Sequence, residues 1–204
     1  MRTPMELSYS GARAQTRTPA VTLIERPDQA RFHLQLDVQI DSAAAAVPLL
    51  QGAALRLIAL LPPLGATLDL TGFDLPQEAT KLSSAASRLH ATLVLPLARD
   101  ASFWDRARRV AQVDDLLRVL VLEGRKQKPF LDVRRDLPAF VVADPEAHRA
   151  ALVERLHARA RSLGGTDLRL KDLRFDQPVA QHSLGLEQVE LSLAVEGTAD
   201  LSLA

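Results

Sequence analysis

The segment from residue 31 to residue 40 alternates strictly between apolar and polar side chains, and this alternation restricts the fold more than any other feature of the sequence. The apolar positions share one face of an extended strand: Phe32, Leu34, Leu36, Val38 and Ile40. The polar positions share the other face: Arg31, His33, Gln35, Asp37 and Gln39. A period of two over this length predicts a strand with one buried and one solvated face, as in antiparallel sheets that are covered on one side.

Residues 88–97 repeat this pattern, with leucine and alanine side chains on one face. The phrases Arg31-Phe-His33-Leu and Arg88-Leu-His90-Ala open the two strands, and each strand leads into a predicted helix. This short sequence repeat is consistent with two βαβ-like halves within one chain.

Two helices are predicted from apolar residues at helical spacing and from residues that favour helix ends. The first spans residues 43–61, and Pro48 predicts that it begins or kinks near that position. The second follows a cap at Ser102 or Asp100, and Gly124 is expected as the glycine just past its end.

A third helix follows Asp144, which has the position and chemistry of an N-cap. Within the second helix, Asp105 with Arg109 and Asp114 with Arg118 lie four residues apart in the acid-first order that stabilises helices. Both pairs are therefore expected on its surface.

Shorter extended segments complete the pattern, at residues 21–24, 67–70, 131–142, 168–175 and 188–195. The apolar phase shifts within residues 168–175, which predicts a β-bulge at Asp172. Because several strands have one polar face, the sequence predicts an α+β fold in which a mostly antiparallel sheet is packed by about three helices.

The length favours one domain or two small ones. Residues 1–19 form an N-terminal segment in which a short strand at residues 7–10 is one interpretation, and residues 20–204 form a single domain. A division of that domain into sub-lobes of residues 20–80 and 86–204 is left open.

The composition excludes several classes of chemistry. The chain has 204 residues, 25 basic and 25 acidic side chains and no cysteine. Without cysteine it has no disulfide, no thiolate metal site and no cysteine nucleophile. The balanced charge argues against binding of nucleic acid over the whole surface.

No apolar segment of the sequence is long enough to span a membrane, and the first twenty residues lack the apolar run of an export signal. As written, the chain is expected to be cytoplasmic. A processed or truncated chain would instead be expected in the periplasm.

The sequence lacks the common phosphate-binding, dinucleotide-binding, zinc-protease and nucleophile-elbow motifs, so no catalytic residue and no cofactor are predicted. His33 and His90 lie on the polar faces of the two alternating strands. If the strands are neighbours, the two rings together with Asp37 are a candidate metal site. Two separate, solvated histidines are the alternative.

A second candidate is a basic patch for phosphate or another small ligand, formed by Arg125, Lys126, Lys128, Arg134 and Arg135. No aromatic side chain is interleaved with these residues, so nucleic acid is not the expected partner. A polar loop after a helix is the alternative.

Asp114 and Asp115 are adjacent acids, and paired acids can perform acid–base chemistry. Neighbouring residues on a helix diverge by about 100°, which favours a solvated, charged helix face instead. Trp104, beside Phe103 at the start of the second helix, is expected to be a packing anchor.

Several phrases resemble the SIMPL-domain family. Residues 25–30, with the letters ERPDQA, and the strand that follows resemble the family's opening P-D-x-A strand. Gly65, residues 113–124 and Asp144 before an Ala/Arg-rich helix resemble its middle, and residues 185–201 resemble its closing strands. The similarity spans about residues 20–203, although the third helix lacks the family's full alanine repeat.

The resemblance implies a non-enzymatic α/β protein that self-associates, because members are often oligomeric and some form ring- or channel-like assemblies. It also implies a role linked to the bacterial envelope or to oxidative stress, and many bacterial members are periplasmic. We therefore expect a homo-oligomer without enzymatic activity, cofactor or nucleic-acid partner. A small-ligand, phosphate or metal-binding module, or an enzyme with a histidine-based site, is the alternative.

Overall fold

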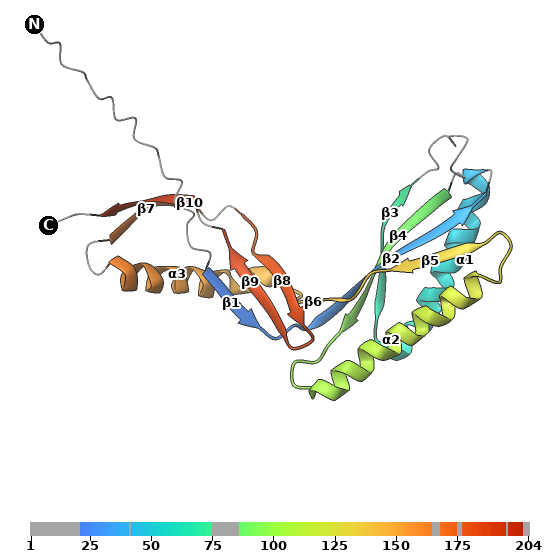
Figure 1. The fold of residues 1–204 in the computed structure, drawn as a ribbon, viewed down its shortest axis with the longest axis horizontal. Helices are drawn as coiled ribbons and strands as arrows, with labels where there is room; N and C mark the ends of the chain where they lie inside the picture. The colour runs from blue at the N-terminus through green and yellow to red at the C-terminus, as the bar shows by residue number, and fades with distance from the viewer. Residues whose placement is uncertain are drawn as a thin grey trace, which may run out of the picture.

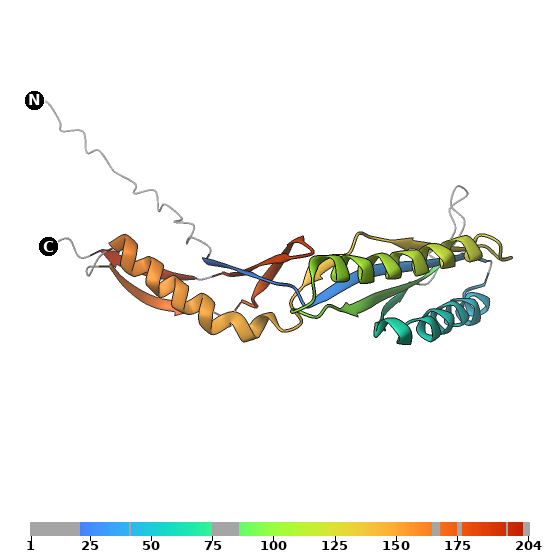
Figure 2. The same ribbon diagram turned by 90° about the horizontal axis from the view of Figure 1, so that it is seen from below.

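The computed structural model of the protein describes residues 21–40, 42–74, 86–164, 168–174, 177–194 and 196–201. They form an α+β fold with three α-helices, and every strand pairing among them is antiparallel, as predicted. Two groups of elements follow one another along the longest axis, so the molecule is elongated (Figures 1 and 2). The short strand predicted at residues 7–10 lies outside the described residues.

The larger group, which we call the large lobe, is built from the central part of the chain. Its elements are β2 (Gln29–Gln39), α1 (Ala43–Leu60), β3 (Thr67–Asp74), β4 (Ala86–Pro96), α2 (Phe103–Gly124), β5 (Leu131–Arg135) and β6 (Ala139–Val141). The strand order is β3-β4-β2-β5, and β6 also pairs with β2. Chain order and strand order together are those of the split βαβ, or ferredoxin-like, arrangement.

The two predicted βαβ-like halves are β2-α1-β3 and β4-α2-β5. Their first strands, β2 and β4, pair with each other at the centre of the sheet, with His33 opposite Thr92 and Gln35 opposite His90. The repeated Arg-x-His phrases, residues 31–33 and 88–90, therefore occupy equivalent positions on either side of the local two-fold axis of this strand pair.

One continuous hydrophobic cluster fills the space between the large lobe's sheet and its two helices. The apolar face of β2 contributes four of the predicted side chains, Phe32, Leu34, Leu36 and Val38, together with Ala30, all of them buried, whereas the fifth predicted residue, Ile40, is partly buried beyond the end of the strand. Leu50 and Leu57 of α1 and Leu117 of α2 pack against them. Both helices therefore cover the same face of the sheet, and the polar face that the alternation predicted stays outside the cluster.

The second group, the small lobe, combines the first described strand with the last part of the chain. Its elements are β1 (Val21–Glu25), β8 (Ala180–Gly185) and β9 (Gln188–Leu193), paired in the order β1-β9-β8, with α3 (Arg149–Gly164) after the short 3₁₀ turn Pro145–His148. Figure 2 shows α3 running along these strands. Leu152 and Leu156 of α3 and Leu191 of β9 belong to a second hydrophobic cluster.

Strands β7 (Leu168–Arg174) and β10 (Glu196–Leu201) form a separate two-stranded ribbon. Lys171 pairs with Thr198 and Arg174 pairs with Glu196, so β7 advances by one residue more than β10 between these pairs. The extra residue is Asp172 or Leu173, so the strand is irregular in the place where the bulge was predicted.

The two hydrophobic clusters do not separate at the possible division between residues 80 and 86. The strands on either side of it, β3 and β4, pair with each other in one sheet. Instead, β1 at the start of the described sequence pairs with β9 near its end, and β8 completes the sheet of the small lobe. Strand partners at this separation leave no local pattern from which they could be predicted.

The helix ends follow the predicted signals with two differences. Ser102 caps α2, because its Oγ accepts a hydrogen bond from the Asp105 backbone N–H at 3.2 Å. One difference is that Asp144 caps the 3₁₀ turn Pro145–His148 and not α3 itself, which begins at Arg149; the Asp144 Oδ1 accepts from the Ala147 N–H at 3.2 Å. Pro48 lies inside α1, which begins at Ala43, so the helix does not start at this proline.

Gly124 is the other difference, since it is the last residue of α2 rather than a left-handed residue beyond it. A Cβ at this position would lie 2.5 Å from the backbone oxygen of Leu131. A glycine is therefore required by the close approach of β5 to the helix end, not by an unusual backbone angle.

Candidate functional site

The polar face of the large sheet holds the three residues of the candidate metal site, and the structure gives each of them a different partner. The strands of His33 and His90 are neighbours, as the metal hypothesis required. His33 Nδ1 lies 3.2 Å from the Thr92 hydroxyl, whereas His90 Nε2 lies 2.9 Å from Asp74 Oδ2 on β3. The two rings thus bind different neighbours, in diagonal rather than opposed positions.

Asp37 is almost completely buried on this face and is surrounded by donors. The Gln35 amide donates to both of its oxygens at 2.9 Å, and the guanidiniums of Arg88 and Arg134 each lie 3.6 Å away. These partners already satisfy the carboxylate. Within the described ranges, no group of three or more His, Cys, Asp or Glu side chains could hold a metal ion.

The predicted basic patch is divided by the sheet. Arg134 extends to the polar face and pairs with Asp132 at 2.9 Å, a hydrogen bond that raises the pKa of Arg134 together with the charge of Asp37. The next residue, Arg135, extends to the helix face and forms an ion pair with Asp114 of α2. Because adjacent strand residues point to opposite faces, these two arginines cannot share one phosphate.

The lobes meet around a buried arginine that no sequence pattern singled out. Arg106 of α2 is fully buried, and its Nη2 donates to the backbone oxygens of Pro27 at 2.7 Å and Leu186 at 2.8 Å. Its Nε lies 3.5 Å from Glu187 Oε1. Burial lowers the pKa of Arg106, and the Glu187 carboxylate opposes this effect.

Residues of the ERPDQA phrase complete the junction. Arg26 Nη2 lies 2.7 Å from Glu187 Oε2, so this carboxylate sits between two guanidiniums. Asp28 accepts from the Arg99 guanidinium at 2.8 Å and from the Ala143 N–H at 2.7 Å. The phrase that carried the family resemblance is therefore the joint between the two lobes.

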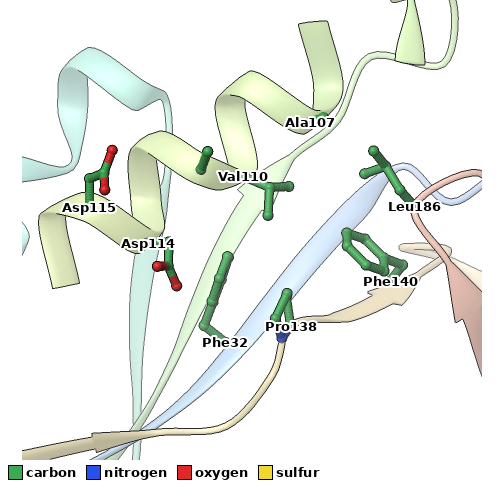
Figure 3. Close-up of a pocket in the computed structure, with 9 residues that line it drawn as sticks. Phe32, Ala107, Val110, Asp114, Asp115, Pro138, Phe140 and Leu186 are labelled. Atoms are coloured by element: carbon green, nitrogen blue, oxygen red, sulfur yellow. The ribbon is translucent and has the colours of Figure 1, made fainter. Parts of the chain in front are cut away.

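A pocket of about 350 Å³ lies beside this junction, between α2 and β6 (Figure 3). Its lining is mostly apolar and consists of Phe32, Ala107, Val110, Ala111, Asp114, Asp115, Pro138, Phe140 and Leu186. The two acids diverge from the helix, as their adjacent positions predicted (Figure 3). Since Asp114 is paired with Arg135, the pocket contains no opposed pair of free carboxylates.

A second hollow differs in character because it is almost entirely apolar. It lies between α1 and the strands β3 and β4 and has a volume of about 500 Å³. We call it the α1–β3 groove, and its lining consists of Val47, Leu50, Gln51, Ala54, Leu55, Ile58, Leu70, Phe73 and Leu89.

Five large side chains of the α1–β3 groove are exposed by between 40 and 57% of their surface: Val47, Leu55, Ile58, Leu70 and Phe73. The sequence carried a signal that could have revealed this surface. Residues 43–60 contain a single charged side chain, Arg56, and a helix that is apolar on all sides normally has more than one covered face.

Trp104 also differs from its prediction. It is 73% exposed and stacks edge-on against Phe103, with 5.1 Å between the ring centroids, so it does not anchor the core. In the part of the chain that the structure describes, no helix is both long and apolar enough to cross a membrane.

Comparisons with known proteins do not assign the chain to a family. No family model matches the sequence, and no curated protein matches it. A solved structure, that of an amidase of the hydantoinase/carbamoylase family from Burkholderia phymatum, has a TM-score of 0.36 and 15% sequence identity over 76% of this chain. The match spans only 38% of the amidase chain, and a likeness this low carries no argument about activity.

Proposed function

We propose that the protein is a non-enzymatic, self-associating protein of the SIMPL type. The observation that carries this proposal is the α1–β3 groove. The largest contiguous apolar patch on a typical monomer covers about 300–600 Å² and is often a functional surface, and the groove is a patch of this kind.

The size of the groove supports association between copies of the chain. Five large apolar side chains, each about half exposed, present on the order of 400 Å² of surface. Two copies that cover each other here would bury roughly 800 Å² from these side chains alone, and neighbouring atoms would bring the total near the ~1,000 Å² expected of a stable interface. An apolar surface with so little charge is complementary to itself.

The residues of the candidate metal site already have partners within the chain, and self-association through the groove does not disturb them. His33, His90 and Asp37 take part in hydrogen bonds or ion pairs across the polar sheet face. The resemblance of the ERPDQA phrase extends the proposal to an envelope- or stress-related role, with a periplasmic location if the chain is processed. Nucleic acid is not a proposed partner.

Native mass spectrometry at micromolar concentration tests the association. We expect the wild-type chain to form a dimer or larger species and Leu55→Asp to be monomeric, because a charge in the groove would have to be desolvated. Leu122→Asp is the matched control, since Leu122 is 51% exposed on α2 and lies outside the groove. A monomeric wild-type chain, or equal dissociation by both variants, would contradict the proposal.

The pocket beside α2 favours a second candidate function, the binding of a small ligand. Its volume lies in the range of ligand sites, and Phe32 and Phe140 could enclose an aromatic or aliphatic body. Saturation-transfer NMR with benzylamine and benzoate tests it, with Val110→Trp as the variant that fills the pocket. Binding that persists in Val110→Trp would place the probe elsewhere.

A further inference from the structure

Strand β3 lies at the edge of the large sheet, next to the exposed part of the α1–β3 groove. In the described residues it pairs with β4 on one side and with no strand on the other. An edge strand with apolar side chains is a template for pairing with another chain. Building on the self-association proposed above, we infer that two copies join antiparallel through β3, so that their sheets become continuous.

The faces of β3 are consistent with such a pairing. Leu68, Leu70 and Phe73 lie opposite Leu93, Ala91 and Leu89 of β4 and therefore share the helix-covered face. Thr67, Asp69 and Asp74 lie on the polar face. The odd-numbered and even-numbered residues share this face because the register shift between Leu70 and Gly72 inserts one extra residue into the strand.

One register of the antiparallel β3 pair places apolar side chains opposite apolar ones and polar side chains opposite polar ones. A two-fold axis between Leu70 and Thr71 places Leu68 opposite the partner's Phe73, so that apolar side chains meet on the helix side. The same axis places Thr67 opposite the partner's Asp74. Neither acid of the strand then faces another acid, an arrangement that would be destabilising in a cross-strand pair.

The helix completes this interface. Val47, Leu55 and Ile58 of α1 line the groove together with Leu70 and Phe73, on the side of the helix next to β3. In the paired sheet both copies of α1 lie on the same side and flank the axis. Each helix thus covers the other copy's exposed strand residues, which explains why α1 is apolar beyond the face that packs on its own sheet.

The absence of cysteine from the chain permits a direct test by disulfide formation. We would mix Thr67→Cys with Asp74→Cys at a concentration below the dissociation constant of the dimer, so that subunits exchange. The mixture would then be concentrated and oxidised with diamide. In the inferred register the two thiols lie opposite each other within disulfide reach, so the mixture should give at least about tenfold more linked dimer than either variant alone. In either variant alone, the identical positions would lie ~24 Å apart along the strands.

Thr67→Cys mixed with Gly72→Cys is the matched control, because it is out of register by two residues. The Gly72 position tolerates a side chain, since a Cβ there would lie 3.8 Å from the nearest atom, on His90. Equal linking in this control would overturn the inferred register.

Hydrogen exchange of the unmodified chain provides an independent measurement that does not depend on any variant. The β3 amides should exchange several-fold more slowly at high than at low protein concentration, because pairing protects them. A dimer that shows neither the disulfide nor this protection overturns β3 pairing and leaves self-association standing. A chain that stays monomeric overturns both proposals.

Discussion

At the scale of single residues, Arg106 is a fully buried charge whose partners come from distant parts of the chain. Its guanidinium donates to the backbone oxygen of Pro27, in the segment that joins the lobes, and to that of Leu186, in the small lobe, and it faces Glu187. Arg106→Ala would leave these buried acceptors without a donor and open a cavity, so we expect the free energy of unfolding to fall by about 3 kcal/mol.

Urea denaturation measures this loss, and Arg108→Ala on the same helix is the control. Arg108 is exposed and pairs with Asp105 at 2.9 Å, a surface ion pair whose removal should cost less than ~0.5 kcal/mol. Similar losses in the two variants would show that the buried network does not hold the lobes together.

Residues also show where local pairing rules fail. Asp114 and Arg118 have the spacing of a stabilising helical pair, yet Asp114 binds Arg135 of β5. Arg109, expected to pair with Asp105, instead donates to the Leu64 backbone oxygen. Both differences arise because a tertiary partner was available whose position depends on the packed fold.

At the scale of elements, two glycines at different places in the helices should respond in opposite directions. Gly52 lies inside α1, and a Cβ added there would have no atom within 4 Å, whereas a Cβ at Gly124 would lie 2.5 Å from the Leu131 oxygen. We expect Gly52→Ala to stabilise the protein by about 0.5–1 kcal/mol through helix propensity. Gly124→Ala should destabilise it by about 1–3 kcal/mol, because helix and strand must move apart.

Thermal unfolding of the two variants compares these effects under the same conditions. Both substitutions add one methyl group to a helix, so helix propensity alone would stabilise both. A stabilising Gly124→Ala would show that β5 does not approach the end of α2 as closely as the structure indicates.

At the scale of the whole molecule, two separate hydrophobic clusters predict two regions of separate stability. Leu191 is fully buried in the small lobe and Leu93 in the large lobe. Leu191→Ala should destabilise its lobe by about 2–5 kcal/mol and accelerate hydrogen exchange in β1, β8 and β9 while β2 and β4 remain protected. Leu93→Ala should show the reverse order.

Mass spectrometry of exchanged peptides distinguishes the lobes in these two variants. Uniform acceleration across both lobes in Leu191→Ala would mean that the molecule unfolds as one cooperative unit. The two hydrophobic clusters would then be separate in packing but would not unfold separately.

Local sequence patterns determined the secondary structure and the fold class. The alternation in residues 31–40, the caps Ser102 and Asp144 and the bulge near Asp172 are all set by neighbours a few residues away, so they could be predicted. Only the tertiary structure decided which strands pair, that Arg106 and the ERPDQA phrase join two lobes, and that the extra apolar side of α1 lines a groove. These features depend on residues far apart in the chain that meet only after packing, and no local period records such contacts.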